Sequence, residues 1–160
     1  MPAAKILERA ELGRRLAQLR ALGRKVVFTC GVFDIVHVGH VRYLEFARAL
    51  GDALVVGINS DDSARRLHKA PGRPIVEAAE RAEVVAALES VDYVCIFDET
   101  RPDETIRALK PDVHVKSAQY AAGDLPEAAA VAENGGVVVL APHYAGHSTT
   151  ALLGRLARSS

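Results

Sequence analysis

Short apolar runs rich in β-branched residues recur along this chain, and a stretch with helical spacing follows each of them. Because neighbouring residues within a run are apolar, rather than every second one, both faces of each expected strand should be buried. Buried strands joined by helices form a parallel sheet with right-handed crossovers. The sequence therefore predicts an α/β fold with a doubly wound, parallel five-stranded sheet. We expect its strands at residues 25–30, 53–59, 93–97, 112–115 and 137–140.

The remaining stretches have the spacing and end signals of helices. The first places Leu12, Leu16 and Leu19 on one face and ends near Gly23, so we expect a leading helix that packs on the rest of the domain. Two prolines and a glycine make residues 68–74 a loop. The expected helices span residues 7–22, 38–50, 61–67, 77–88, 102–109, 125–133 and 148–157.

Length and charge limit the class of protein. The 160 residues fit a single domain, with the leading helix in residues 1–23 and the core in residues 25–160. The formal net charge is zero, whereas a nonspecific nucleic-acid binder usually carries a basic surplus. No apolar run approaches the roughly 20 residues that a membrane-spanning helix needs. We therefore expect neither nucleic acid nor a membrane as a partner.

The two cysteines bear on the cellular compartment. Cys30 and Cys95 lie within apolar runs and form no CxxC pair. This placement is typical of small buried side chains in a reducing environment. The charged and amphipathic N-terminal stretch does not have the apolar core of a signal peptide. The sequence thus predicts a soluble, cytoplasmic protein.

The most informative segment is TCGVFDIVHVGH at residues 29–40, which joins the first strand to the first long helix. Gly31 permits a tight departure from the strand. His37 and His40 share one face at the helix start, where unpaired N–H groups favour an anion, and Gly39 leaves room for a phosphate. Two imidazoles there could stabilise charge that grows during nucleotidyl transfer. The alternatives are structural histidines, or two metal ligands for which the spacing shows no third.

Several blocks resemble one known family in the same order. They are GVFDIVHVGHVRYLEFARALGD, VGINSDDS, GRPI, ALESVDYV, PDVHVK, NGG and HSTTALL. Together they resemble the HxGH nucleotidyltransferase superfamily, within it the cytidylyltransferase-like group, and most of all its heptose 1-phosphate adenylyltransferases. The resemblance implies a Rossmann-like nucleotidyltransferase fold. It also implies transfer of a nucleoside monophosphate, AMP from ATP, to a sugar phosphate such as heptose 1-phosphate, which gives ADP-heptose and pyrophosphate.

The same resemblance implies roles for the first block. His37 and His40 would contact the triphosphate and stabilise the transition state, with Gly39 beside them. Val32 and Phe33 would hold the nucleotide. Asp34 belongs to the signature too, and either caps the turn by accepting backbone N–H bonds or takes a direct part in catalysis.

A second block precedes the last expected helix. Ser148 and Thr149 can cap that helix, and the resemblance implies that Gly146, Ser148, Thr149 and Thr150 also cradle a phosphate of the nucleotide. Capping and phosphate binding are compatible here. His143 and His147 flank this block, and we interpret them as structural or, at most, as local modifiers of the phosphate site.

Basic residues should neutralise the triphosphate and the sugar phosphate. Lys69 and Arg73 lie in the expected loop, which could close over the substrates. Arg81 lies where relatives have an arginine that contacts phosphate, and Lys116 ends the fourth strand. We assign Lys69 and Arg81 to catalysis, Arg73, Arg81 and Lys116 to substrate binding, and Lys116 also to the nucleotide. Mg²⁺ should accompany the triphosphate without direct protein ligands.

The chain departs from the heptose group at two places. Cys30 stands where relatives typically have Asn, and Ser117-Ala118-Gln119 stands where they have Gly-Gly-Asp. These differences bear on the choice of nucleobase and acceptor. The alternatives are therefore transfer of CMP from CTP to glycerol 3-phosphate, transfer of AMP to another phosphorylated acceptor such as a flavin or pantetheine precursor, and a nucleotide-binding regulatory module. By analogy with relatives, we expect a homodimer.

Overall fold

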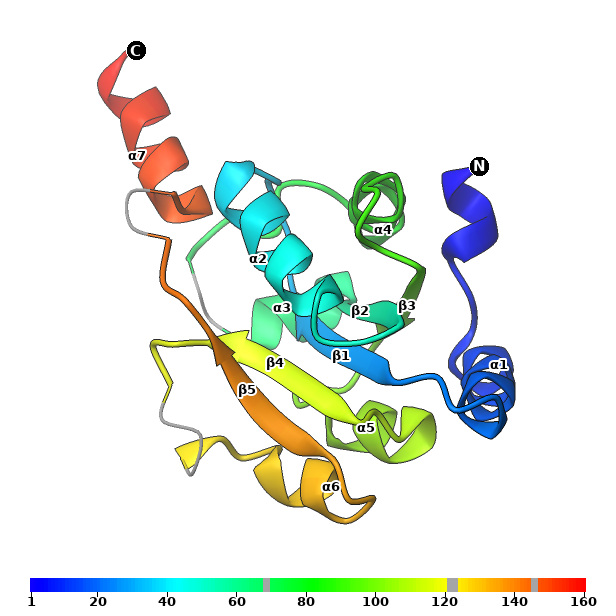
Figure 1. Cartoon of the computed structure of the whole chain (residues 1–160). Coiled ribbons are helices and arrows are strands. Elements are labelled where there is room, and N and C mark those ends of the chain that lie inside the picture. Colours follow the sequence, from blue (N-terminus) through cyan, green and yellow to red (C-terminus); the bar gives the residue numbers. More distant parts are fainter. Residues whose placement is uncertain (68–69, 121–123, 145–146) are drawn as a thin grey trace.

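Five parallel strands form the sheet at the centre of the molecule. The computed structural model describes residues 1–67, 70–120, 124–144 and 147–160. The strand order is β3-β2-β1-β4-β5, and every neighbouring pair runs parallel (Figure 1). This arrangement confirms the predicted α/β fold. The strands are β1 (Val26–Gly31), β2 (Ala53–Asn59), β3 (Tyr93–Phe97), β4 (Val113–Ser117) and β5 (Val137–Ala141).

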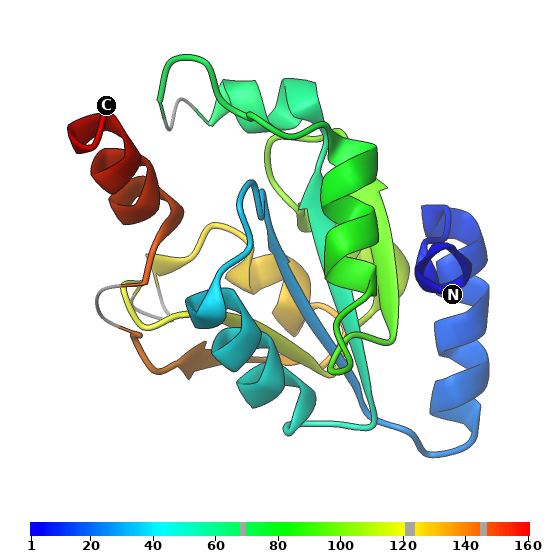
Figure 2. The same cartoon turned by 90° about the horizontal axis from the view of Figure 1, so that it is seen from above.

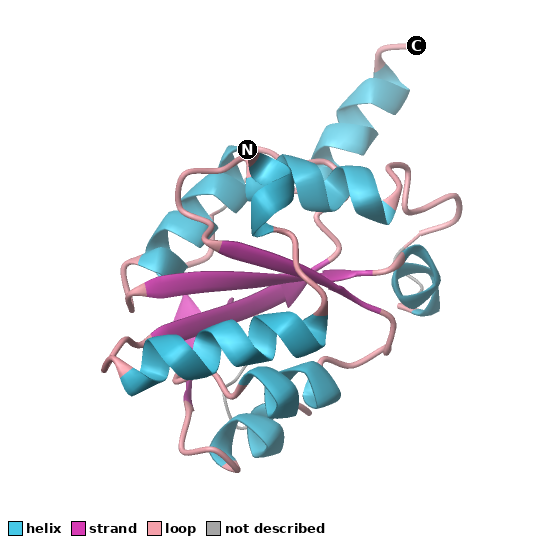
Figure 3. Ribbon diagram, turned by 90° about the vertical axis from the view of Figure 1, so that its right-hand side faces the viewer, coloured by secondary structure: helices cyan, strands magenta, loops and turns pink. Residues whose placement is uncertain are grey.

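Helices cover both faces of the sheet (Figure 3). One apolar cluster joins the strands to α2 and α4, and a second joins them to α1, α5 and α6. The last helix, α7, projects from this body (Figures 1 and 2). The helices are the 3₁₀ helix η1 (Pro2–Lys5) and the α-helices α1 (Arg9–Ala21), α2 (Val38–Arg48), α3 (Asp61–Arg66), α4 (Ala78–Ala86), α5 (Asp103–Leu109), α6 (Ala128–Ala132) and α7 (Thr149–Arg158).

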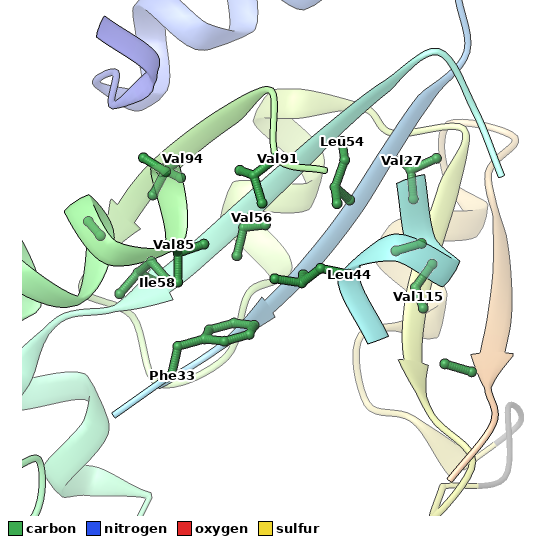
Figure 4. Packing of buried hydrophobic residues seen from close by; sticks show 14 of the residues in the cluster. Val27, Phe33, Leu44, Leu54, Val56, Ile58, Val85, Val91, Val94 and Val115 are labelled. Carbon is green, nitrogen blue, oxygen red and sulfur yellow. The ribbon is translucent and has the colours of Figure 1, made fainter. Parts of the chain in front are cut away.

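The core explains why these sequences form these layers. All seven residues of β2 are buried, because neighbours pair with it on both edges and helices pack on both faces. On the other side of the sheet, Leu12 and Leu16 of α1 are fully buried, which confirms that the leading helix packs on the domain. Figure 4 shows the cluster under α2 and α4, where Leu44 and Phe33 lie close to the end of β1.

Most element boundaries lie within two or three residues of the expected ones, and α6 is the main exception. We expected this helix to begin at Leu125, but it spans only Ala128–Ala132. Pro126 disfavours helical backbone at Leu125, the residue before it, so the helix cannot begin where we expected. The short helix η1 was not anticipated. Across the described ranges, no helix combines the length and the apolar character that crossing a bilayer requires.

The order of the strands fixes where a site can form. From β1 the chain builds outward through β2 to β3, and then returns to β4 on the other side of β1. The carboxyl ends of β1 and β4 therefore lie side by side at the point where the winding reverses. Ligands of open α/β sheets bind at such switch points. The histidine segment, residues 37–40, follows β1, and Lys116 lies at the end of β4.

Candidate active site

Two histidine rings close the first turn of α2. Nδ1 of His37 accepts a hydrogen bond from the N–H of Gly39 at 3.1 Å, and Nδ1 of His40 accepts one from the N–H of His37 at 3.2 Å. This reciprocal pattern is a capping box, a motif usually built from Ser or Thr and Glu or Gln. The ring centroids lie 3.9 Å apart. The pair is therefore fixed at the carboxyl end of β1 as the sequence suggested.

The capping bonds also determine which ring nitrogen carries hydrogen. Because each Nδ1 accepts a backbone N–H, the neutral rings of His37 and His40 carry their proton on Nε2, which is then a donor. Burial, together with the nearby His147, lowers the pKa of His37 from its ordinary value. At neutral pH, His37 therefore offers an Nε2–H from an uncharged ring.

Gly39 is required by the close packing around it. A Cβ at this position would lie 2.8 Å from Cε1 of His37 and 2.8 Å from Cβ of His147, which is closer than such atoms approach. The segment before α7 thus rests directly on the first turn of α2. His147, which was expected to be structural or a local modifier, contacts the histidine turn from this side.

The second block is anchored to the first by Thr149. Its hydroxyl donates a hydrogen bond to the carbonyl of Ile35 at 3.1 Å, and its side chain is buried. Ser148 caps α7 by accepting the N–H of Ala151, as expected. Ser148 and Thr150 are exposed beside the anchor, whereas Gly146 lies outside the described residues. The structure therefore brings Ser148 and Thr149 to the histidine turn, with Thr149 as the structural tie.

The turn between β1 and α2 is held in an uncommon conformation. Phe33 has a φ angle of 51°, in the left-handed region that residues with a side chain rarely adopt. Its ring packs against the ring of His40, and the two ring centroids lie 5.2 Å apart. A Cβ on Gly31 would lie 3.0 Å from the same phenyl ring, which explains the glycine at the strand end. The Phe33 ring thus helps to fix the orientation of the His40 ring.

Arg81 is placed differently from the expectation. It is 1% exposed, and its guanidinium donates to the carbonyls of Val32 and Val76 and to the carboxylate of Asp61 at 2.6–2.8 Å. These partners occupy the group in the interior, so it braces the strand end against the loop before α4. A phosphate contact would require the guanidinium to leave them. The part of Arg81 in binding phosphate therefore stays a prediction.

Asp34 accepts hydrogen bonds, but not from its own turn. Its buried carboxylate receives the N–H groups of Ile75 and Val76 at 2.9–3.0 Å and Nε of Arg73 at 3.1 Å. Burial alone would raise its pKa, but these donors outweigh burial and lower it. Asp34 thus ties the loop before α4 to the site, and Arg73 is paired with it. Lys69, in the same loop, lies outside the described residues.

Lys116 lies at the open end of the sheet beside Cys30. Its Nζ is 4.0 Å from Sγ of Cys30, 3.7 Å from a carboxylate oxygen of Glu127 and 5.7 Å from the centre of the Tyr120 ring. Cys95 is buried as expected, but Cys30 is only partly buried because it sits at this open end. Cys30, which stands where relatives typically have Asn, therefore lies next to the lysine that we expect to bind phosphate.

Comparisons with known proteins show the family of this chain. Residues 28–154 match the cytidylyltransferase-like family. The chain belongs to that family. It is 49% identical to a D-beta-D-heptose 1-phosphate adenylyltransferase from Bordetella bronchiseptica, over 96% of this chain and 94% of the relative. It is 47% identical to the bifunctional protein HldE of Trichlorobacter lovleyi, over 94% of this chain and 30% of the relative.

A solved structure supports the same assignment. The crystal structure of a lipopolysaccharide core biosynthesis protein from Thermoplasma volcanium superposes with a TM-score of 0.63 and 30% identity, and covers 76% of this chain and 98% of that one. The chain spans about a third of the length of its bifunctional relatives. Membership of the cytidylyltransferase-like family thus rests on sequence and on fold together.

Sequence reasoning missed two buried polar residues of this cytidylyltransferase-like site. His114, the second residue of β4, and Glu127, before α6, are both buried, and His114 Nε2 lies 3.2 Å from a carboxylate oxygen of Glu127. The histidine among the apolar residues of an expected strand was the available signal. A second missed feature lies above it, where the hydroxyls of Thr29 and Tyr43 both reach the carbonyl of Val115 at 2.9 Å. These contacts join β1, α2 and β4 beneath the site.

The described residues offer no ready-made metal centre. Within residues 1–67, 70–120, 124–144 and 147–160, no group of three or more His, Cys, Asp or Glu side chains is arranged to hold a metal ion. A cavity of about 220 Å³, lined by Phe33, Asp34 and Arg81 among others, lies between the segment that follows β1 and helix α4. The arrangement therefore offers hydrogen-bond donors and a cation around the switch point.

Proposed function

We propose that this chain transfers AMP from ATP to heptose 1-phosphate and releases pyrophosphate. The observation that carries the proposal is the pair of capped imidazoles, His37 and His40, at the switch point of a cytidylyltransferase-like sheet. The similarity to a heptose 1-phosphate adenylyltransferase over 96% of the chain supports the choice of substrates.

In this reaction a phosphate oxygen of the sugar attacks the α-phosphorus of ATP in line with the departing pyrophosphate. Negative charge grows on the phosphate oxygens as the bond between the α- and β-phosphates lengthens. The Nε2–H groups of His37 and His40 donate to this charge, and their capping bonds spare them from reorienting as it develops. Lys116 supplies a positive charge from β4. No covalent intermediate is needed, because positioning and charge stabilisation suffice.

We expect Mg²⁺ to enter with the triphosphate. Mg²⁺ usually keeps several waters and few protein ligands in nucleotide sites, so phosphate oxygens would hold most of it. This fits a site whose described carboxylates are paired, as Asp34 is with Arg73 and two backbone N–H groups. When bound, the ion would neutralise charge on the phosphates.

The test removes each imidazole and keeps the helix cap. Asn at an N-cap and Gln at the third helical position accept the same backbone N–H bonds, so His37→Asn and His40→Gln preserve the capping box. We expect each variant to keep its melting temperature within a few degrees and to lose on the order of a hundredfold in kcat, the usual effect of losing one preorganised donor. A folded His40→Gln variant with wild-type turnover would refute the role of the rings.

A substrate matrix identifies the nucleotide and the acceptor. Pyrophosphate release is measured for ATP and CTP, each with heptose 1-phosphate, glycerol 3-phosphate, and phosphorylated flavin and pantetheine precursors. We expect the highest kcat/KM for ATP with heptose 1-phosphate. A preference for CTP with glycerol 3-phosphate would correct the substrates, and nucleotide binding with no product from any pair would favour a regulatory module.

We also propose that the chain works as a homodimer in the cytoplasm. The apolar face of α1 packs within the domain and is not available for a contact between subunits, whereas Leu156 on α7 is 64% exposed. Helix α7 itself projects from the body of the molecule (Figure 1). Light scattering after size exclusion measures the mass directly. A particle of 17.1 kDa at micromolar concentration would contradict the dimer.

A further inference from the structure

A buried carboxylate lies beneath the carboxyl end of β4, next to the expected phosphate-binding lysine. Glu127 is 4% exposed and occupies the position just before the short helix α6, without a capping bond from its side chain. One of its oxygens lies 3.2 Å from Nε2 of His114 and 3.7 Å from Nζ of Lys116. Burying a carboxylate is costly unless its partners compensate, so these two contacts call for an explanation.

The protonation states of the three groups follow from their surroundings. Burial would raise the pKa of Glu127, but the hydrogen bond from His114, its own backbone N–H and the charge of Lys116 lower it to about 2. Burial lowers the pKa of His114, so its ring is neutral at pH 7 and donates Nε2–H to Glu127. Glu127 is therefore a fixed negative charge, and His114 holds it in place from below.

The negative charge acts on Lys116 from the inner side. The Lys116 side chain is 21% exposed, so its ammonium group lies between the interior and the open end of the sheet. Burial alone would lower the pKa of Lys116, but the acidic groups around it, Cys30 and Glu127 foremost, raise it. The centre of the Tyr120 ring lies 5.7 Å from the ammonium nitrogen. The cation is thus kept charged and held at one place.

We propose that Glu127 is a positioning residue: its buried carboxylate holds the Lys116 ammonium group charged and aimed at the substrate phosphates beyond β4. The inference rests on the proposed function, since it assigns Lys116 a phosphate to meet. It adds a residue that makes no contact with substrate and acts only through the lysine. His114, stacked on Phe28 with ring centroids 5.6 Å apart, serves as the rigid support of that carboxylate.

A purely structural role for Glu127 makes a different prediction. If Glu127 only satisfied His114, an uncharged acceptor of the same shape would serve equally well. Glu127→Gln provides one, because its amide oxygen can still accept Nε2–H of His114. The variant therefore removes the charge and keeps the packing. Glu133→Gln, at the exposed end of α6, removes a carboxylate that pairs with Arg107, far from Lys116 in the sequence, and serves as the matched control.

The decisive experiment is a double-mutant cycle of Glu127→Gln and Lys116→Met. We expect Glu127→Gln alone to lower kcat/KM about tenfold, within the range of contacting pairs, and Lys116→Met to lower it further. In the Lys116→Met background, Glu127→Gln should change kcat/KM no more than twofold. Glu133→Gln should match the wild type. Equal losses from Glu127→Gln in both backgrounds would overturn the proposal, because the residue would then act without Lys116.

A titration gives a readout that a structural role would not move. The groups that face the Lys116 ammonium are Cys30 from β1, Glu127 from α6 and Tyr120 after β4, with His114 behind Glu127. Removing the Glu127 charge should lower the pKa of Lys116, so the alkaline fall in activity should begin at a lower pH. Carbon NMR of the lysine side chains measures this directly, since the chain has five lysines and Lys116→Met assigns the signal. An unchanged lysine titration in Glu127→Gln would overturn the proposal.

Two precautions keep the outcome interpretable. Should Glu127→Gln fail to fold, Glu127→Asp keeps the charge and withdraws it from the lysine. We expect Glu127→Asp to lower kcat/KM, while its fall in activity at alkaline pH stays close to that of the wild type. A Glu127→Asp variant with wild-type kcat/KM would overturn the proposal. Should the wild type form no product with any substrate pair, the proposed function fails, and the NMR titration still decides whether Glu127 controls the charge of Lys116.

Discussion

Gly39→Ala tests how closely activity depends on the placement of the histidine turn. The added methyl group would lie 2.8 Å from Cε1 of His37 and 2.8 Å from Cβ of His147. Ordinary contact begins near 3.4 Å, so the ring or the segment before α7 must move by roughly half an ångström or more. The backbone of α2 offers little room to absorb this, because both capping bonds depend on the same turn.

The size of the effect follows from this displacement. A misplacement of about 1 Å in a catalytic group costs on the order of a hundredfold in rate, so we expect kcat to fall between about tenfold and a hundredfold. Stability should change little, because alanine is favoured over glycine in a helix by up to about 1 kcal/mol, which offsets part of the strain. Activity and stability are thus expected to separate.

The assay is pyrophosphate release with ATP and heptose 1-phosphate, together with thermal unfolding of the same samples. Gly154→Ala in α7 is the matched control, because a Cβ there would meet only the flexible end of Arg158 at 3.5 Å. The control should retain wild-type kcat. A Gly39→Ala variant that is folded and turns over at the wild-type rate would refute the reasoning, since the rings would then not need their observed placement.

Two further predictions concern buried ionisable groups. Asp34→Asn should lower the free energy of unfolding by about 1.5–3 kcal/mol at pH 7, because it removes charge-assisted bonds to residues 73–76. Because the pKa of Asp34 is lowered in the folded state, its charge stabilises the wild type above about pH 4, and this stabilisation is lost as the carboxylate protonates at lower pH. In urea unfolding, the difference in stability between wild type and Asp34→Asn should therefore be smaller at pH 3 than at pH 7. The pKa of His114 is also depressed, so the unfolded chain binds a proton that the folded chain does not once the pH falls below about 6.5. The wild type should therefore lose unfolding free energy as the pH falls from 7 to 5, by up to about 1.4 kcal/mol per pH unit from this group. His114→Gln should lack this part of the loss, which urea unfolding over the same pH range measures.

Each of these predictions can fail in a specific way. An Asp34→Asn variant with an equal stability deficit at pH 3 and pH 7 would show that the carboxylate charge is not the source of the effect. Parallel pH profiles for wild type and His114→Gln would show that the buried ring does not titrate between the folded and unfolded states.

The layers of the fold could be predicted because local and tertiary preferences agree. The apolar, β-branched residues of β2 suit only a strand buried on both faces, and the structure buries all seven. The leucine spacing of α1 likewise determined which side of the helix packs. The prediction failed at α6, where apolar periodicity suggested a helix from Leu125, whereas the backbone restriction that Pro126 imposes on Leu125 makes the helix begin later.

The site was only partly predictable, for a physical reason. His37 and His40 were found because one short segment carries the whole motif. Asp34 bonds residues some forty positions later, and Arg81 reaches back to Val32, so their partners depend on how distant segments meet. Glu127 was missed for the same reason, since nothing near it in the sequence shows that Lys116 and His114 lie beside it.

The central position of β1 has a consequence for motion. This strand pairs on both edges, with β2 and β4, whereas β3 and β5 form the rims of the sheet. Fluctuations that fray a rim strand break its pairing with β2 or β4 and leave β1 in register. Amide hydrogens of β1 should therefore exchange with solvent among the slowest in the chain. The histidine turn follows directly from the strand that should unfold locally least often, so its two rings can stay aligned during local fluctuations elsewhere in the molecule.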